Sequence, residues 1–435
     1  MGPPGSAGGE DLSRDASAGT LVSGPGPELE YQRGGWRELL ANPRYRLLLA
    51  CQTFSGTGYA VYAVSVLFLA YGLTGNLLIA GAVLFVEYGV YSATFLVAPI
   101  VDRALDKRWV LLACFPVQAA AAGALAYELR AGTLSIGVLL GLVFLLAVLW
   151  DLDWAVFMVA PRIVLPKRQL FIADGFASVV AVGTQIGGYA GGGALVYLVG
   201  PFGGATAYAI LLLAATAVTV PLVLTVEASP RTPFWETFRR GWDGFRGSAG
   251  RTLSELGGLE ILVGFFAAVP PLLIPAIAYQ RFASPAEVYG PLVTAFAVGG
   301  SAAGIWIGHL NPRRFVGRIV ILTPAVAGIC VLGLVASASS LIVIALLLAG
   351  VGAALAARYT AKYTWLQGTY PPELLGRLSA NLYLFTGVSG SIAVLVVGSL
   401  SVGVPLGTLM LLDAIGLLIG GVLAIGLPHV RRMSF

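Results

Sequence analysis

The stretch A-P-I-V-D-R-A-L-D-K-R-W-V-L, from Ala98 to Leu111, places a short charged segment between two long apolar runs. Its charged residues are Asp102, Arg103, Asp106, Lys107 and Arg108. An apolar helix of about 20 residues can span a bilayer, and charged residues gather in the turns between such helices. We therefore predict that this stretch is a tight, charged hairpin at a membrane surface.

The composition of the whole chain is typical of a membrane protein. Hydrophobic residues make up 57% of the 435 residues and charged residues only 11%, whereas soluble proteins carry roughly 25% charged residues. The mean hydropathy is +0.86, and the 57 glycines suit close packing of helices in lipid. The net charge of +5 comes from basic residues in short loops, so it indicates no nucleic-acid partner. These features predict a multi-pass protein embedded in a lipid bilayer.

Twelve apolar runs in the sequence are long enough to cross a bilayer. They cover 46–72, 77–99, 108–128, 134–158, 171–196, 204–226, 258–279, 289–309, 316–336, 340–364, 379–400 and 405–427. The turns after odd-numbered runs are short and nearly uncharged, whereas the turns after even-numbered runs are basic. Because basic loops stay on the cytoplasmic side, we expect both termini in the cytoplasm and the chain in a plasma or inner membrane. The predicted fold class is an all-α membrane protein with twelve transmembrane helices.

The two halves of the chain look like copies of each other. When the halves are aligned, Pro166 falls near Pro372 and Asp174 near Asn381. A six-plus-six repeat predicts two pseudo-symmetric six-helix bundles with a substrate site at their interface. The expected segments are a disordered cytoplasmic tail (1–43), an N-terminal bundle (44–226), a cytoplasmic linker with an amphipathic helix (227–257), a C-terminal bundle (258–427) and a cytoplasmic tail (428–435).

Ionisable residues within the apolar runs are candidates for function. A charged side chain costs on the order of 3 kcal/mol or more at the centre of a bilayer, so it should face a cavity or a partner. Glu87 lies near the middle of the second run, in FVEYGVY. A carboxyl group that burial makes easier to protonate suits proton exchange, so Glu87 is our candidate for proton coupling. The alternative is a structural carboxylate bonded to neighbouring tyrosine or serine side chains.

Acidic and basic pairs occupy the fourth and tenth runs. The fourth carries Asp151 and Asp153, and the tenth carries Arg358 and Lys362 one helical turn apart. Residues two apart on a helix differ by about 200° in direction, so only one aspartate can face a given cavity. We hypothesise a cytoplasmic gate, in which an aspartate pairs with a basic residue when the cavity opens outward. Alternatively, the basic pair binds an anionic substrate while the acids serve coupling, or each pair reaches water at a helix end.

Prolines and polar residues supply further candidates. Prolines break helices, and in membranes such breaks line cavities or act as hinges, which makes hinge candidates of Pro270, Pro271 and Pro275. Candidate substrate contacts, with helix packing as the alternative, are Gln52, Tyr59, Tyr62 and Gln185. The sequence has neither a Gly-x-x-x-x-Gly-Lys-Ser/Thr loop nor a cluster of histidine, cysteine and acidic residues. We therefore expect no ATP hydrolysis, metal, cofactor or enzymatic activity.

Four segments together resemble a known family. In the hairpin, Asp102, Arg103, Lys107 and Arg108 match a D-R and basic-pair motif, while Ala98, Leu105 and Asp106 depart from it. The other segments are LFLAYGLTGNLLIAG at 67–81, Arg162 with Leu165, Pro166 and Asp174, and Pro372-Glu373 with Gly376-Arg377. Over roughly 45–425, the chain resembles the major facilitator superfamily, in particular the bacterial and archaeal branch that includes the enterobactin exporter and macrolide efflux proteins.

The resemblance implies that the first, fourth, seventh and tenth spans line a central cavity and that the hairpin latches one conformation. We expect a monomeric secondary active transporter that alternates access to a small-molecule substrate, with protons as the coupling ion. The resemblance favours export of a drug-like or siderophore-like molecule. The alternatives are uptake of a sugar or organic anion, and a membrane sensor or accessory protein that does not transport.

Overall fold

The structure is a computed structural model that describes residues 35–94, 101, 104–166, 169–225, 248–309, 315–337, 339–370 and 372–433. Its backbone is helical over nearly all of this length, as expected where no water is present to bond free amide groups. The helices are α1 (Gly35–Ala41), α2 (Pro43–Thr74), α3 (Leu78–Ser92), α5 (Arg108–Ala131), α6 (Ile136–Val164), α7 (Leu170–Val199), α8 (Pro201–Thr219), α10 (Ser248–Ala267), α11 (Val269–Arg281), α12 (Pro285–His309), α13 (Val316–Ala336), α14 (Leu341–Thr369), α15 (Pro372–Leu400), α16 (Leu406–Ile425) and α17 (Pro428–Arg431).

The helices agree with the twelve expected spans. In the described part of the chain, 11 segments are long and apolar enough to cross a membrane, with α10 and α11 together forming the segment Gly250–Arg281. The remaining span is α3, an apolar helix of 15 residues. Residues 95–100, which we expected to complete that span, lie outside the described residues. The all-helical, twelve-span fold class is therefore confirmed.

Local sequence signals set both ends of α2. At its start, the side chain of Asn42 accepts hydrogen bonds from the backbone N–H groups of Arg44, at 3.0 Å, and Tyr45, at 3.3 Å. Asparagine is a favoured capping residue because it satisfies amide donors that the first turn leaves free. At its end, Gly75 has a φ of 69° and donates its N–H to the carbonyl of Tyr71 at 2.8 Å. Glycine adopts this left-handed conformation at low cost, so it ends the helix.

Two helices begin earlier in the sequence than the expected bundles. We assigned 35–43 to the tail, but α1 occupies most of that stretch and packs against α7. The reason is Leu39, which is fully buried in a small apolar cluster with Tyr45 and Leu165. Similarly, α10 begins at Ser248, inside the stretch expected as a linker. Residues 1–34 and the expected amphipathic helix lie outside the described residues.

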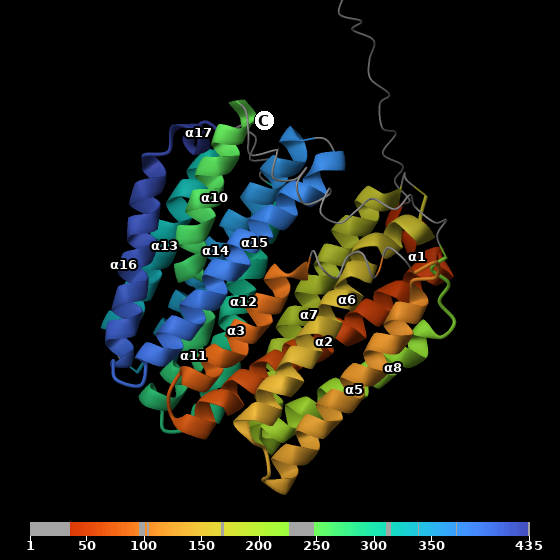
Figure 1. The fold of residues 1–435 in the computed structure, drawn as a ribbon, viewed down its shortest axis with the longest axis horizontal. Coiled ribbons are helices and arrows are strands. Elements are labelled where there is room, and N and C mark those ends of the chain that lie inside the picture. Colours follow the sequence, from red (N-terminus) through yellow and green to blue (C-terminus); the bar gives the residue numbers. More distant parts are fainter. Residues whose placement is uncertain are drawn as a thin grey trace, which may run out of the picture.

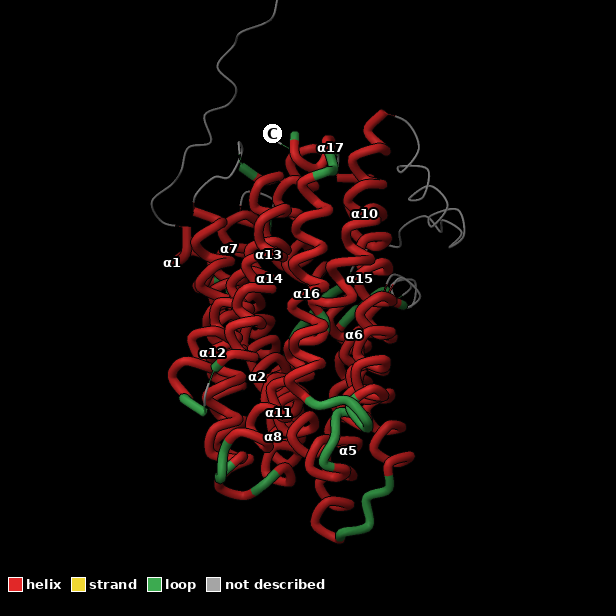
Figure 2. The backbone as a smooth tube through the Cα atoms, turned by 90° about the vertical axis from the view of Figure 1, so that its left-hand side faces the viewer, coloured by secondary structure: helices red, strands yellow, loops and turns green. Residues whose placement is uncertain are grey.

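The helices form two groups. Figure 1 shows α2, α5, α6 and α8 in one group and α10, α13, α14 and α16 in the other. Between the groups, α3 packs against α15, and α7 packs against α12. Both views place α1, the start of α10 and α17 toward one end of the molecule (Figures 1 and 2), which we call the terminal end. The opposite end, where α2 is followed by Gly75 and α7 by Gly200, is the distal end.

The two groups make close contacts at the distal end. A Cβ atom on Gly193 of α7 would collide with the backbone of Gly290 of α12, so these two backbones touch. The N–H of Leu77 donates to Oγ of Ser401 at 2.9 Å, which joins the turn after α2 to the end of α15. Small residues allow such close approach of helices in lipid. The distal end is therefore closed in this structure.

Aromatic and amide side chains add to the distal closure. Nε2 of Gln280, near the end of α11, donates to the hydroxyl of Tyr71 on α2 at 3.0 Å. The ring of Tyr279 lies 4.9 Å from the ring of Phe68 and 4.9 Å from that of Tyr71, measured between centroids. These contacts link the last turn of α11 to α2.

Candidate functional site

A cavity of about 400 Å³ lies between the two groups of helices. Helices α2, α3 and α6 of one group and α10 and α15 of the other supply its walls. The lining residues are Tyr59, Glu87, Tyr88, Tyr91, Ala147, Trp150, Asp151, Gly264, Ala267, Ala268, Thr386, Gly387 and Gly390. A pocket of this size can hold a small organic molecule, since ligand pockets measure about 300–1,000 Å³.

Aromatic side chains form one wall of the cavity. The rings of Tyr59 on α2 and Trp150 on α6 are stacked, with centroids 4.0 Å apart and planes 16° apart. Tyr88 and Tyr91 on α3 also line the space. Stacked aromatic faces offer a flat apolar surface with a negative electrostatic potential. This wall can therefore hold a flat ring or a cation.

Two acidic side chains line the same cavity. Glu87, our candidate for proton coupling, lies on α3, and Asp151 lies on α6. Oδ2 of Asp151 accepts a hydrogen bond from Oγ1 of Thr94 at 2.8 Å. Among the described residues that line the cavity, there is no lysine, arginine or histidine. The cavity therefore favours protons or cationic groups over anions.

Asp153 faces away from the cavity into the packed helices. Its side chain is 0% exposed, and its Oδ2 accepts a hydrogen bond from Nε2 of Gln118 on α5 at 2.9 Å. Oε1 of Gln118 in turn accepts from the hydroxyl of Tyr208 on α8 at 2.8 Å. The ring of Tyr208 packs against that of Tyr62 on α2 at 5.2 Å. Asp151 and Asp153 thus have opposite surroundings, as their separation of two residues on one helix requires.

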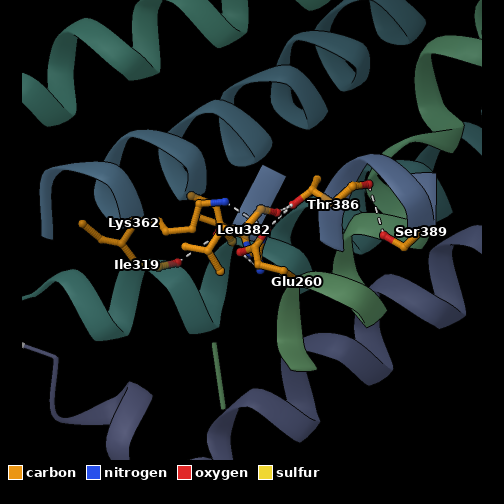
Figure 3. A network of polar contacts seen from close by, with 8 residues as sticks. Glu260, Ile319, Lys362, Leu382, Thr386 and Ser389 are labelled. Carbon is orange, nitrogen blue, oxygen red and sulfur yellow. Dashed lines mark hydrogen bonds and ion pairs between the residues drawn. The ribbon is translucent and has the colours of Figure 1, made fainter. Parts of the chain in front are cut away.

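Arg358 and Lys362 both pair with Glu260, a residue that the sequence analysis did not select. Nη2 of Arg358 lies 2.7 Å from Oε1 of Glu260, and Nζ of Lys362 lies 2.9 Å from its Oε2. Oγ1 of Thr386 donates to the same Oε2 at 2.9 Å. Figure 3 shows Glu260 directed toward Lys362 and Thr386. The three charged residues are buried, and the cluster joins α10, α14 and α15 and reaches the cavity wall through Thr386.

The position of Glu260 within its helix explains why it was missed. The sequence predicts a seventh apolar run that begins at residue 258, which places Glu260 at the end of the expected span. Because α10 begins at Ser248, Glu260 lies three turns inside the helix. The sequence did contain a signal for this pairing. Glu260 is a single acid near the start of the seventh run, and the tenth run, in the same half, carries the basic residues Arg358 and Lys362.

A tyrosine cluster lies beside the basic pair and reaches the other group of helices. Nζ of Lys362 lies 4.8 Å from the ring centroid of Tyr363, and the ring of Tyr363 packs on that of Tyr383 at 5.2 Å. The hydroxyl groups of Tyr383 and Tyr359 are 2.8 Å apart. Tyr383 also contacts Tyr91, which lines the cavity, at 5.4 Å between ring centroids. The basic pair is therefore connected to the cavity through aromatic contacts.

The expected gate pairs are absent from the described residues in this conformation. Arg358 and Lys362 bind Glu260, whereas Asp151 binds Thr94 and Asp153 binds Gln118. Pairing of an aspartate with a basic residue stays a prediction for another conformation. The direct role of the basic pair in binding an anion also stays untested.

The charged hairpin is partly described. Asp102 and Arg103 lie outside the described residues. Nζ of Lys107 donates to the carbonyl of Val101 at 2.8 Å, and Nε of Arg108 pairs with Oδ2 of Asp106 at 3.0 Å. Oδ1 of Asp106 accepts the N–H of Leu224 at 3.2 Å. The hairpin is therefore fastened to the segment that follows α8.

The remaining candidates fall in three places. Tyr59 lines the cavity, whereas Gln52, Tyr62 and Gln185 are not among its lining residues. Pro270 and Pro271 lie in the first turn of α11 and Pro275 lies inside it, so the helix break that the prolines predict occurs at Ala268. Arg162 is exposed in the last turn of α6. For Asp174, Glu373 and Arg377, the structure describes the helical backbone but not the side chains.

The sequence matches no protein-family model and no curated protein. The structure, however, is similar to solved structures of membrane transporters. A mutant of the nucleoside transporter NupG has a TM-score of 0.73 and 11% identity, and the match covers 88% of this chain and 100% of that one. A POT family transporter in complex with 5-aminolevulinic acid has a TM-score of 0.71 and 10% identity, and the match covers 89% and 96%.

A bacterial homologue of the iron transporter ferroportin, in an inward-facing state, has a TM-score of 0.64 and 17% identity. That match covers 89% of this chain and 98% of the other. At such low identity the likeness concerns the fold. The chain thus has the twelve-helix fold of transporters of the major facilitator type, which the sequence resemblance implied. The narrower resemblance to the exporter branch remains a prediction.

Proposed function

We propose that this protein is a secondary active transporter that alternates access to the central cavity and exports a small organic molecule in exchange for protons. The observation that carries the proposal is the cavity between the two helix groups, which combines two carboxyl groups with a stacked aromatic wall. The solved structures with this fold include a nucleoside transporter and a bacterial homologue of the iron transporter ferroportin. Their fold places the substrate between the two halves, where the cavity lies in this chain.

The cavity suggests the chemical class of the substrate. Glu87 and Asp151 favour a positively charged group, and the stacked rings of Tyr59 and Trp150 favour a flat apolar body. A drug-like aromatic amine has both features. An organic anion fits less well, because Arg358 and Lys362 are already paired with Glu260 and are not among the residues that line the cavity. Uptake of a neutral solute such as a sugar is the alternative that differs in direction and in charge.

The distal contacts define one state of the proposed cycle. We place the basic loops in the cytoplasm, so the distal end, which is closed in this structure, would face the exterior. The break between α10 and α11 supplies a hinge about three helical turns from the Tyr279 contacts that close this end. We assign the opposite, outward-open state to a rearrangement in which the two helix groups approach each other at the terminal end.

Arg358 is the basic residue best suited to a gate on the terminal side. Although Arg358 is paired with Glu260, its Nε and Nη2 atoms make no hydrogen bond with the described residues. Lys362, in contrast, bonds Glu260 directly at 2.9 Å. We propose that Arg358 pairs with Asp151 when the two helix groups close at the terminal end. The charged hairpin with Asp102 and Arg103 would then latch that state.

A transport screen tests the proposed function. Purified protein in proteoliposomes is offered aromatic amines, sugars and organic acids, and the accumulated solute is measured with and without a pH gradient. The expected result is gradient-driven movement of one or more aromatic amines, absent from protein-free liposomes. Movement of sugars or acids alone would contradict the proposed substrate class. Binding of amines without any movement of solute would instead indicate a membrane sensor.

A further inference from the structure

Asp413 is a buried carboxyl group that the central cavity does not include. It lies in α16, it is 2% exposed, and both of its carboxyl oxygens lack a hydrogen-bond partner among the described residues. An ionised carboxylate without a partner is very unfavourable in an apolar interior, so the group must be neutralised. A bound proton neutralises it without any further ligand.

The packing of α16 places Asp413 at the break between α10 and α11. Gly416 and Gly420 lie on the same face of α16 as Asp413, one and two turns further along. A Cβ atom on Gly420 would meet Val263, and one on Gly416 would meet the ring of Phe266. The two helices therefore run antiparallel with their faces in contact. Continuing this register by one turn brings Asp413 to the level at which α10 ends and α11 begins.

The helix break offers acceptors for a protonated carboxyl group. Pro270 and Pro271 carry no N–H, so they cannot bond the carbonyl groups of Phe266 and Ala267 as residues of a regular helix would. A protonated carboxyl group donates one hydrogen bond, and such a carbonyl can accept it. Ala267 also lines the central cavity. The break therefore borders the cavity through Ala267 and lies at the same height along the helices as Asp413.

No charged group among the described residues pairs with Asp413. The titratable residues on the helices that pack against α16 are Arg251, Glu255, Glu260, Tyr279, Arg281, Arg318, Cys330, His429 and Arg431. The nearest along α16 is Arg281, whose Nη2 lies 3.8 Å from Sδ of Met410. Its Nη1 donates to the carbonyl of Leu334 at 2.8 Å and to Oγ of Ser337 at 2.9 Å. Arg281 is thus bonded to α13 and its following turn, and it makes no hydrogen bond to Asp413.

We propose that Asp413 is a proton-binding site, loaded from the central cavity through the break between α10 and α11. It would carry a second proton beside that of Glu87, on the other half of the molecule. The role of this proton in transport rests on the proposed function, whereas the protonation of Asp413 does not. An outward movement of α11 would expose the carboxyl group to water and release the proton.

Infrared spectroscopy tests the protonation directly. The full chain is placed in lipid nanodiscs at neutral pH, with carbon-13 in the side-chain carboxyl groups of aspartate. We expect a carboxylic-acid C=O band that shifts with the label and with exchange into heavy water. The Asp413→Asn variant should lose the part of this band that Asp413 contributes, whereas Glu287→Gln, a change at an exposed acid, should retain the full intensity.

A second sample keeps the test decisive if the Asp413→Asn variant does not fold. In a protein carrying Asp151→Asn, Asp153→Asn and Asp174→Asn, Asp413 is the remaining aspartate within the described helices, so the band should persist. Absence of the band there, or a band of undiminished intensity in folded Asp413→Asn, would overturn the proposal. Loss of the band on replacing choline by sodium would also overturn it, in favour of a sodium site. Failure of the transport screen would not affect these infrared results, because they measure the protonation of Asp413 and not transport.

Discussion

Replacing Glu260 by glutamine should strongly destabilise the half of the molecule that contains α10, α14 and α15. Glu260 is 0% exposed and is the shared partner of Arg358, at 2.7 Å, and Lys362, at 2.9 Å. The substitution keeps the shape of the side chain but leaves two buried cations without a counter-ion. Removing one member of a buried ion pair typically costs about 3–5 kcal/mol, because the remaining charge stays desolvated.

Thermal unfolding of the purified protein in detergent measures this effect. For a unit of about 150–250 residues, 1 kcal/mol corresponds to a shift of about 2–4 °C, so the expected fall in Tm is on the order of 10 °C. Glu287→Gln, which removes an exposed acid, is the matched control and should leave the Tm unchanged. The variant with Glu260→Gln, Arg358→Met and Lys362→Met should recover much of the loss, since it removes the unpaired charges. A Tm for Glu260→Gln within about 2 °C of the wild type would refute this reasoning.

Three further substitutions test separate parts of the structure. Gly290→Leu should prevent the distal closure, because its side chain would collide with the backbone of Gly193; labelling of a cysteine introduced in the distal turns should then become faster, and unchanged labelling would contradict the closure. Trp150→Ala should weaken binding of an aromatic amine about two- to tenfold, since it removes the ring stacked on Tyr59; calorimetry that finds equal affinity would exclude this wall as the binding surface. Asp153→Ala should lower stability by about 1–3 kcal/mol because it leaves a buried amide donor unpaired, whereas Asp153→Asn retains an acceptor and should cost less in the same unfolding assay.

The spans could be predicted because their signal is local. A run of about 20 apolar residues has one stable outcome in a bilayer, and the capping asparagine and glycine of α2 mark its ends. The break at Ala268 was also predictable, because Pro270 and Pro271 lack the N–H that a continuous helix needs. The start of α10 was not, since the helix extends through a polar segment that apolar periodicity does not detect.

The pairing of the charged residues could not be predicted from the sequence. The pseudo-symmetry of the two halves suggested that Arg358 faces an aspartate of the fourth span. Instead, its partner Glu260 comes from another helix of the same half, and only the packing of α10 and α14 against α15 determines that choice. Asp413 was overlooked for a similar reason. A single acid in an apolar run gives no indication of whether a partner lies beside it.

The most direct test of proton-coupled transport measures proton movement together with substrate movement. Proteoliposomes that contain a pH-sensitive dye are loaded with a transported aromatic amine, and the dye signal is recorded as the amine leaves. We predict that the wild type moves protons inward as the amine moves outward. The Glu87→Gln variant should still move the amine down its gradient but should lose the proton signal. Proton movement that is equal in the wild type and in Glu87→Gln, or amine export without any proton signal in the wild type, would contradict the account.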